Sequence, residues 1–545
     1  MLELVDIFGY LSVLLRAGTL IGQSFLLGGL LFMYCIARPA PQVSSDALER
    51  VRTRLRRMFR VAAIALAVVQ LLYLYVDSAV LMATAEIGLR DVVGANFFLA
   101  GSVMLAASLL VALIAGSQGR YVPHCLGLLV VIVLAASVMT NHAAARIDGR
   151  AWLILLTLLH EASTGFWIGG LPFLLLGLYV AGDRPTQWYL TQRFSRLALV
   201  SVVVLVLSGF GMSLAYVGSW RSLIGTSYGV MLMAKIMMLA AMLALGGINF
   251  LMLRKYSPDD VVPRLRRLVE AEVGIGITIV LAAASLTSQP PAVDLVHDTV
   301  QPSHIWARFK PEWPRLRSPD ISALSTRLPG QDVSPLDPTR QIIAYNSEGS
   351  PLSLRSLNDR KWSEYNHHWM GLIVIAMGVL AVLARTGRAK WAENWPLLMI
   401  GIAIFIFLRG DPECWPMGPK SFWATWADPE IFQHRAAALL CLAFAVFELR
   451  VRRNPSPGGI LPLIFPVICA VGAALLLTHS HGSANVREEM LAELSHTPMA
   501  VLGVIAGWSR WLELRLPPED RTIPSWIWPM CFVLIGAGLL NYREI

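Results

Sequence analysis

The chain has 545 residues, of which 56% are hydrophobic and only 15% are charged. Soluble domains carry about one quarter charged residues, so this composition excludes an ordinary soluble globular protein. The 45 Lys and Arg residues outnumber the 36 Asp and Glu residues, but they stand in short clusters between apolar runs. Such clusters are typical of a membrane orientation signal, so the net charge of +9 indicates no nucleic-acid partner.

Apolar runs long enough to cross a bilayer as helices recur along the whole chain. They are too long and too continuous to be the alternating strands of a membrane barrel. We therefore predict an all-α fold, a polytopic transmembrane helical bundle of about 14 spans. The expected spans are 10–36, 61–83, 96–116, 123–140, 151–180, 195–217, 229–253, 268–288, 367–385, 395–410, 433–450, 459–478, 497–514 and 525–541.

Two features of these runs carry further expectations. The run 151–180 is long enough to be tilted or to break at Gly169-Gly170-Leu171-Pro172. The first run lacks a basic leading segment and precedes a strongly basic loop, so we expect a retained helix and no cleaved signal peptide.

The six cysteines are scattered, without a C-x-x-C motif, and are expected to be packing thiols.

Basic residues alternate between the loops and set the expected orientation. Loops such as RVRTRLRRMFR and RVRR are rich in Arg and are expected to be cytoplasmic, which places both termini on the periplasmic side. The polar segment 289–366 then lies outside as a periplasmic linker or cap. It divides the chain into an N-terminal bundle of about eight spans, residues 1–288, and a C-terminal bundle of about six spans, residues 367–545.

Six of the 11 histidines fall at predicted outer ends of spans in the C-terminal bundle. They are His367, His368, His434, His479, His481 and His496. A compact bundle brings such helix ends together, so we expect one outward-facing site. Neutral imidazole is a good ligand for copper, zinc and iron, and it can also relay protons. Metal binding by a subset of these residues is the favoured interpretation, and interfacial histidines with proton or structural roles are the alternative.

Neighbouring side chains are candidates to support these ligands. Met370 offers a thioether, which suits Cu(I). Asp411, Glu413 and Glu489 offer carboxylates that can orient imidazole rings as hydrogen-bond acceptors. A salt-bridge cluster that ends a helix is the alternative for Asp411 and Glu413.

A second polar group lies in the N-terminal half. His142 follows the fourth expected span, and His160 lies deep in the fifth span with Glu161 beside it. Ionisable residues inside an apolar run are costly unless they are paired or hydrated, so they are functional candidates. We expect His142 and His160 to be metal ligands and Glu161 to lie on an ion path. A histidine that is hydrogen-bonded to a neighbouring helix is the alternative.

Several motifs occur in order between residues 140 and 255. They are NHAAA, a His followed by W-x-G-G in LLHEASTGFWIGGLPF, the segment R-F-S-R-x-A, a mid-helix Ser-Gly, and T-x-Y-G-x-x-x-x-x-K in a helix that ends near an Asn. This region resembles the copper resistance D (CopD) family of inner-membrane proteins. The resemblance covers the first 140 residues loosely and leaves the C-terminal bundle outside. It implies copper handling between periplasm and cytoplasm, alongside a periplasmic copper-binding partner.

Together these features predict a copper-handling protein of the bacterial inner membrane that binds or transports copper and is not an enzyme. No nucleotide-binding loop or aspartyl-phosphate motif occurs in the sequence, so any transport is expected to be passive or ion-coupled.

Two other functions stay open from the sequence. One is a membrane electron-transfer protein with haem b, because histidines from two helices can clamp a haem; His434 with His479 or His496 are the candidates. The other is an accessory subunit of a respiratory or oxidase complex, with residues 289–366 as the docking surface.

Overall fold

The computed structural model describes most of the chain as helices. The residues outside the description are 1, 42, 296–297, 321–353, 413, 427–428, 455–458, 478–485 and 544–545. The side chains of 2–7, 354–359, 429–430, 433, 486–489 and 492 are outside it as well. No β-strand occurs among the described residues.

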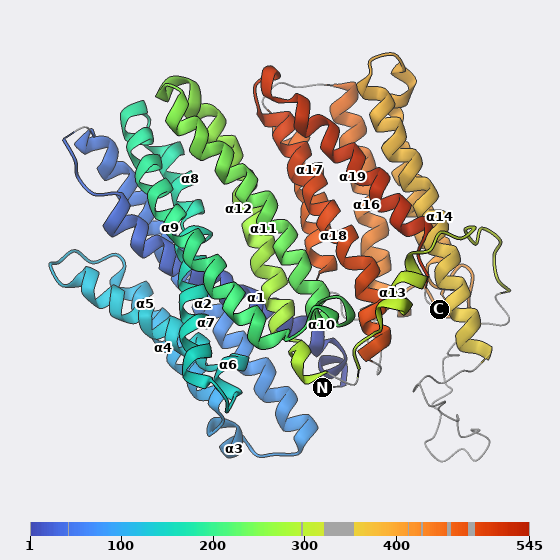
Figure 1. Cartoon of the computed structure of the whole chain (residues 1–545), viewed down its shortest axis with the longest axis horizontal. Helices are drawn as coiled ribbons and strands as arrows, with labels where there is room; N and C mark the ends of the chain where they lie inside the picture. The colour runs from blue at the N-terminus through green and yellow to red at the C-terminus, as the bar shows by residue number, and fades with distance from the viewer. Residues whose placement is uncertain are drawn as a thin grey trace. The chain divides into compact units, whose positions relative to one another are not determined.

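The N-terminal half contains long helices joined by short turns (Figure 1). A π-helical turn, Phe32–Ile36, continues the first helix. The helices are α1 (Leu2–Leu31), α2 (Ser45–Ala85), α3 (Leu89–Val93), α4 (Asn96–Ile114), α5 (Val122–Met139), α6 (His142–Ala145), α7 (Arg150–Trp167), α8 (Leu171–Val180), α9 (Arg184–Tyr216), α10 (Trp220–Gly225), α11 (Ser227–Lys255) and α12 (Pro258–Thr287).

The C-terminal half follows the same plan. Its helices are α13 (Pro302–Phe309), α14 (Leu354–Arg385), α15 (Leu397–Arg409), α16 (Pro429–Arg453), α17 (Leu461–Leu476), α18 (Val486–Arg515) and α19 (Thr522–Leu540). Proline stands in the first turn of α5, α8, α9, α12, α13 and α17. Its fixed φ suits that position, where no intrahelical donor is needed.

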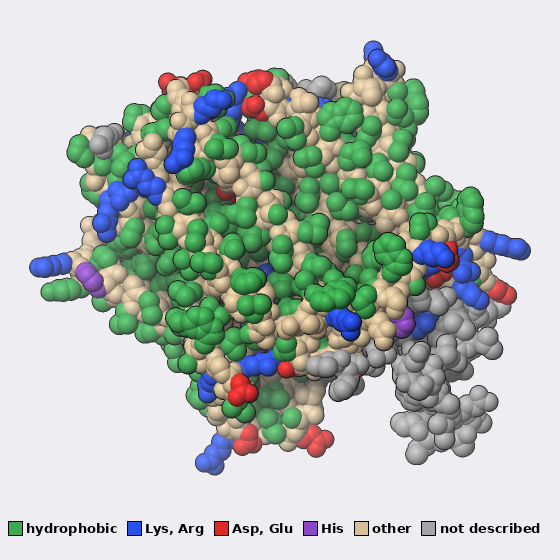
Figure 2. Space-filling view, viewed as in Figure 1, with side chains coloured by type: hydrophobic (Ala, Val, Ile, Leu, Met, Phe, Trp, Pro, Cys, Tyr) green, Lys and Arg blue, Asp and Glu red, His purple; other side chains and the backbone are tan. Residues whose placement is uncertain are grey.

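The predicted helical membrane bundle is confirmed. Each of the 14 predicted runs contains a helix, and 11 helices of the described chain are long and apolar enough to cross a membrane. The number of true spans and the side on which the termini lie stay predictions. Figure 2 shows hydrophobic side chains covering most of the visible face, as expected for helices that face lipid.

The predicted break in the fifth run is also confirmed. Helix α7 ends at Trp167 and α8 begins at Leu171, with Pro172 in its first turn. Of the two glycines between them, Gly169 allows close contact with the backbone of α1, and Gly170 makes room for the Phe194 ring.

Contacts within the chain separate two compact units. One comprises Met1–Leu223 with Met231–Val296. The other comprises Ile224–Val230 and the later part of the chain. In this second unit the amide of Val300 donates to the carbonyl oxygen of Gly225 at 2.9 Å, which fixes the segment after α12 to the end of α10.

Glycine lets α1 cross the α7–α8 break at backbone contact distance. A Cβ atom on Gly169 would overlap the carbonyl of Ser24, and one on Gly28 would overlap the backbone of Gly169 and Gly170. One turn earlier, a Cβ on Gly165 would lie 2.7 Å from the Leu27 side chain. Small residues are common at such crossings in membrane proteins. The hydrophobic effect does not drive helices together within lipid, so their association relies on the close van der Waals packing that small residues allow.

A similar crossing joins α14 to α19 in the second unit. A Cβ atom on Gly371 would lie 2.5 Å from the amide nitrogen of Leu540 and 2.8 Å from the carbonyl oxygen of Gly536. This crossing sets the start of the span in α14 against the end of α19, next to Tyr542.

A buried charge cluster ties α14, α16 and α18 together in the second unit. Glu448, which is fully buried, accepts from Arg510 at 2.8 Å and pairs with Arg452 at 3.0 Å. Glu513 pairs with Arg510 and Arg385, each at 2.7 Å, and accepts from the Trp528 indole at 2.6 Å. Each carboxylate meets at least two donors, so we assign the cluster a structural role.

We predict that Gly169→Ala destabilises the protein by about 1–3 kcal/mol or prevents folding, because the added methyl group forces α1 away from α7 and α8. The check is thermal unfolding of the detergent-solubilised protein with size-exclusion chromatography. Gly127→Ala on α5 is the control, since nothing lies within 4 Å of a Cβ there. Equal unfolding temperatures for the two variants would contradict the close crossing.

Candidate functional site

Glu161 stands at the centre of a polar network in the first unit. Its Oε2 accepts from Gln23 Nε2 of α1 at 2.9 Å, and its Oε1 accepts from Asn141 Nδ2 at 2.6 Å. The side-chain oxygen of Asn141, Oδ1, in turn accepts from Arg16 Nη2, and Arg16 Nη1 donates to Thr140 Oγ1 at 3.0 Å. One asparagine amide therefore links a guanidinium on α1 to a carboxylate on α7.

The network satisfies a carboxylate that an apolar helix could not hold alone. An unpaired charge at this depth costs several kcal/mol, and two amide donors with a nearby guanidinium offset that cost. Gln23 is only 2% exposed, and its own Oε1 has no hydrogen-bond partner among the described residues. A buried amide oxygen without a donor, next to a carboxylate, is suited to a cation or a water molecule.

His160 points from α7 to α9. Its Nδ1 lies 3.3 Å from Ser208 Oγ, whose own hydrogen is donated to the Val204 carbonyl at 2.7 Å. The pattern assigns Nδ1 as the protonated nitrogen and leaves the lone pair on Nε2. Gly209 makes room for the ring, since a Cβ atom there would lie 3.1 Å from His160 Cε1. The predicted metal ligand is thus oriented by a hydrogen bond to a neighbouring helix.

His142 begins the short helix α6 and lies outside the candidate spans. Its Nε2 is buried and has no hydrogen-bond partner within the described part of the chain. Burial lowers the pKa of His142, the charges of Arg16 and Arg146 lower it further, and backbone groups of Thr287 and Gln289 act in the opposite direction. A neutral imidazole with an unused nitrogen is the form that binds a metal ion.

In the second unit, His367, His496 and Tyr542 form a cluster of three rings. His367 stacks on Tyr542 with ring centres 3.8 Å apart, and His496 meets both rings edge-on at 5.7 Å. His367 Nδ1 donates to the carbonyl of Ser363 at 2.8 Å, which leaves the lone pair on Nε2. Two of the predicted histidine ligands, from α14 and α18, therefore do come together.

His368 has both ring nitrogens occupied. Its Nδ1 accepts from the backbone N–H of Arg315 at 2.6 Å, and its Nε2 donates to the carbonyl of Tyr542 at 2.8 Å. The ring is 5% exposed. His368 could bind a metal only if it released the Arg315 amide, so its geometry favours the alternative structural role.

His434 and Asp411 form a pair, with Nδ1 and Oδ1 2.7 Å apart. Asp411 is 8% exposed and so fixes the orientation of the half-exposed His434 ring, as a supporting carboxylate would.

Met370 packs against the hydrophobic core formed by α14, α15 and α19 and their neighbours.

Four predicted site residues cannot be placed. His479, His481 and Glu413 lie outside the described residues, and so does the side chain of Glu489. Among the side chains that the structure does describe, no group of three or more His, Cys, Asp or Glu is arranged to hold a metal ion. The role of each predicted site residue stays a prediction.

The polar partners of the predicted residues were missed from the sequence. Arg16 and Gln23 interrupt the first apolar run, and a polar residue inside a span is a signal that could have identified them. The sequence motifs include Ser208 only within a Ser-Gly pair and Asn141 only within NHAAA, and neither motif indicates a contact with α7. Tyr542 carries no such signal, because its place depends on the crossing of α14 and α19.

These features define a multi-pass helical membrane protein with ionisable and amide side chains buried in its bundle. Residues 189–286, which run from α9 through α12, match the family model of copper resistance protein D, CopD. This region is therefore similar to copper resistance protein D, and the resemblance predicted from the motifs is confirmed.

One similar curated protein is the copper transport protein CutJ of Bacillus subtilis (strain 168). It is 35% identical over 161 residues, which cover 29% of this chain and 29% of the relative. The match therefore spans less than a third of either protein. No solved structure matches the chain.

We predict that His142 makes stability depend on pH. The folded-state pKa of His142 is below the ordinary value of 6.5. As the pH decreases through 6.5, His142 is therefore protonated in the unfolded chain before it is protonated in the folded protein. The folded protein is not destabilised by this residue above pH 6.5, and its stability falls as the pH decreases below that value. His142→Gln removes this contribution. The check is the unfolding temperature of both proteins from about pH 7 to about pH 5. Over this range the unfolding temperature of the wild type is expected to fall further than that of His142→Gln. Parallel curves would contradict the assignment.

Proposed function

We propose that this protein handles copper at the inner membrane of a bacterium, by binding copper on the periplasmic side and transporting or delivering it. The observation that carries the proposal is the CopD-like region at 189–286, whose helix α9 holds His160 in place through Ser208. The printed name of the relative, a copper transport protein, supports the same chemistry.

The pair His367 and His496 is the proposed outer copper site. The two rings come from different helices, and hydrogen bonding leaves the Nε2 lone pair of His367 for a ligand. Imidazole nitrogen suits copper well, and a site of two nitrogens leaves positions open for exchange. His434 with Asp411, and the undescribed His479 and His481, are the further residues that we propose to take part.

The network of Glu161 is the proposed ion path through the first unit. His142 and His160 each offer a nitrogen lone pair, and Gln23 with Glu161 offers oxygens. Oxygen ligands hold copper less tightly than imidazole or thiolate does. A path that alternates these donors binds the ion weakly enough to let it move on.

The proposed chemistry is ligand exchange, and the protein is not an enzyme in this account. A periplasmic copper-binding protein is the proposed donor or acceptor, and a respiratory complex is the other proposed recipient.

The test is the copper bound by purified full-length protein. We predict that the double variant His367→Ala with His496→Ala binds copper at least about tenfold more weakly than the wild type, because it loses two nitrogen ligands. Copper content by mass spectrometry, with a chelator competition titration, measures this.

His304→Ala is the matched control, since it removes an exposed imidazole from α13 outside the ring cluster. Its copper affinity is expected to equal that of the wild type. Unchanged affinity in the double variant would remove the outer site from the proposal. A visible spectrum of the same samples adds a second outcome, because a Soret band would point to haem binding instead.

A further inference from the structure

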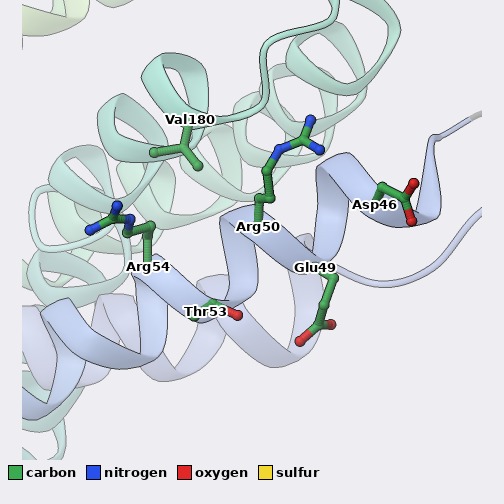
Figure 3. A pocket seen from close by; sticks show the side chains of 6 residues that line it. All are labelled: Asp46, Glu49, Arg50, Thr53, Arg54 and Val180. Carbon is green, nitrogen blue, oxygen red and sulfur yellow. The ribbon is translucent and has the colours of Figure 1, made fainter.

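A hollow opens beside the first turns of α2 in the N-terminal unit (Figure 3). It has a volume of about 660 Å³, within the usual range of ligand sites, and it is open to solvent on one side. Its lining residues are Asp46, Glu49, Arg50, Thr53, Arg54 and Val180.

Arginine dominates the charge of this segment. Residues 45–60 contain six Arg and two acidic residues, which gives 6 − 2 = +4. Of the two acids, Glu49 is already paired with Arg56 at 2.8 Å. Asp46 is then the one remaining acid that lines the hollow, against the guanidinium groups of Arg50 and Arg54.

The two arginines are one helical turn apart and lie on either side of Val180 (Figure 3). Arg50 is anchored, because its Nη2 donates to the carbonyl of Ala181 at the end of α8 at 3.3 Å. Arg54 is exposed and has neither a hydrogen bond nor an ion pair among the described residues. One fixed and one free guanidinium, with the hydroxyl of Thr53 between them in sequence, suit a phosphate group.

The same face of α2 becomes apolar two turns after Arg54, beyond Arg57. This face carries Val61, Ile64 and Val68, which follow Arg57 at alternating spacings of four, three and four residues. Their side chains are 58%, 46% and 52% exposed. A helix face with arginines at one end and exposed aliphatic side chains below matches a molecule with an anionic head and hydrocarbon tails. A free phosphate ion has no hydrocarbon part that could pack against these aliphatic side chains.

We propose that this hollow binds the headgroup of an anionic phospholipid, with the acyl chains along Val61, Ile64 and Val68. Arg50 and Arg54 contact the phosphate. The expected cytoplasmic position of residues 50–60 agrees with this, because basic clusters next to spans attract the anionic lipids of that leaflet.

The experiment measures lipid binding by delipidated full-length protein in detergent. The probes are a short-chain phosphatidylglycerol, the matching phosphatidylcholine, and inorganic phosphate. The variants are the wild type, the double variant Arg50→Gln with Arg54→Gln, and the control Arg60→Gln. Arg60 carries the same charge on the same helix but lies outside the hollow, near Gly116 at the end of α4.

The expected result is that phosphatidylglycerol binds the wild type and Arg60→Gln equally and the double variant at least about tenfold more weakly. Phosphatidylcholine and inorganic phosphate bind at least about tenfold more weakly than phosphatidylglycerol to the wild type. Equal loss in Arg60→Gln would show diffuse charge attraction and overturn the site. Displacement of the lipid by phosphate at equal affinity would overturn the lipid assignment in favour of a free anion.

Arg54→Gln alone keeps the test valid if the double variant does not fold. Arg54 has no partner among the described residues, so its replacement removes no contact of the fold. Wild-type affinity for phosphatidylglycerol in that variant would contradict the proposal.

Discussion

The close crossing of α1 over the α7–α8 break is the contact on which the first unit depends. The glycines at 28 and 169 let two backbones touch, which places Gln23 opposite Glu161. A wider crossing would leave the carboxylate of Glu161 in an apolar bundle with one donor fewer, at a cost of several kcal/mol. The W-x-G-G motif is therefore a packing feature that serves a polar centre, and its glycines need not touch a ligand.

The two units hold buried charge in different ways, and the difference bears on function. In the second unit, Glu448 and Glu513 are each bonded to arginines in a closed cluster. In the first unit, Glu161 accepts hydrogen bonds from the amides of Gln23 and Asn141 and lies beside the Ser137 hydroxyl. The guanidinium of Arg16 is linked to it through Asn141. Carboxylates that each pair with two arginines are suited to a structural role, although Glu448 Oε2 itself has no hydrogen-bond partner among the described residues. A carboxylate held by neutral amides keeps a net attraction for cations, as the proposed ion path requires.

Sequence reasoning predicted the helices well because each expected span is a long apolar run, and such a run has one stable form in a bilayer. It also found the break at Gly169–Pro172, where glycine and proline act locally. It singled out His160 and Glu161, which lie half-buried in α7, and their roles stay predictions. It could not predict that Ser208 would form a hydrogen bond with His160, or that Tyr542 would stack on His367. Those contacts depend on which helices cross and at which residues the crossing occurs. The pairing of His368 with the Arg315 backbone is of the same kind.

The most direct measurement is copper flux into vesicles that contain the full-length protein, compared between the wild type and Glu161→Gln. The amide has nearly the same shape but no negative charge. The account predicts that flux falls to the level of empty vesicles while copper still binds at His367 and His496. Glu393→Gln, which changes an exposed acid between α14 and α15, is expected to transport normally. Undiminished flux in a folded Glu161→Gln protein would contradict the claim that a cation passes this carboxylate.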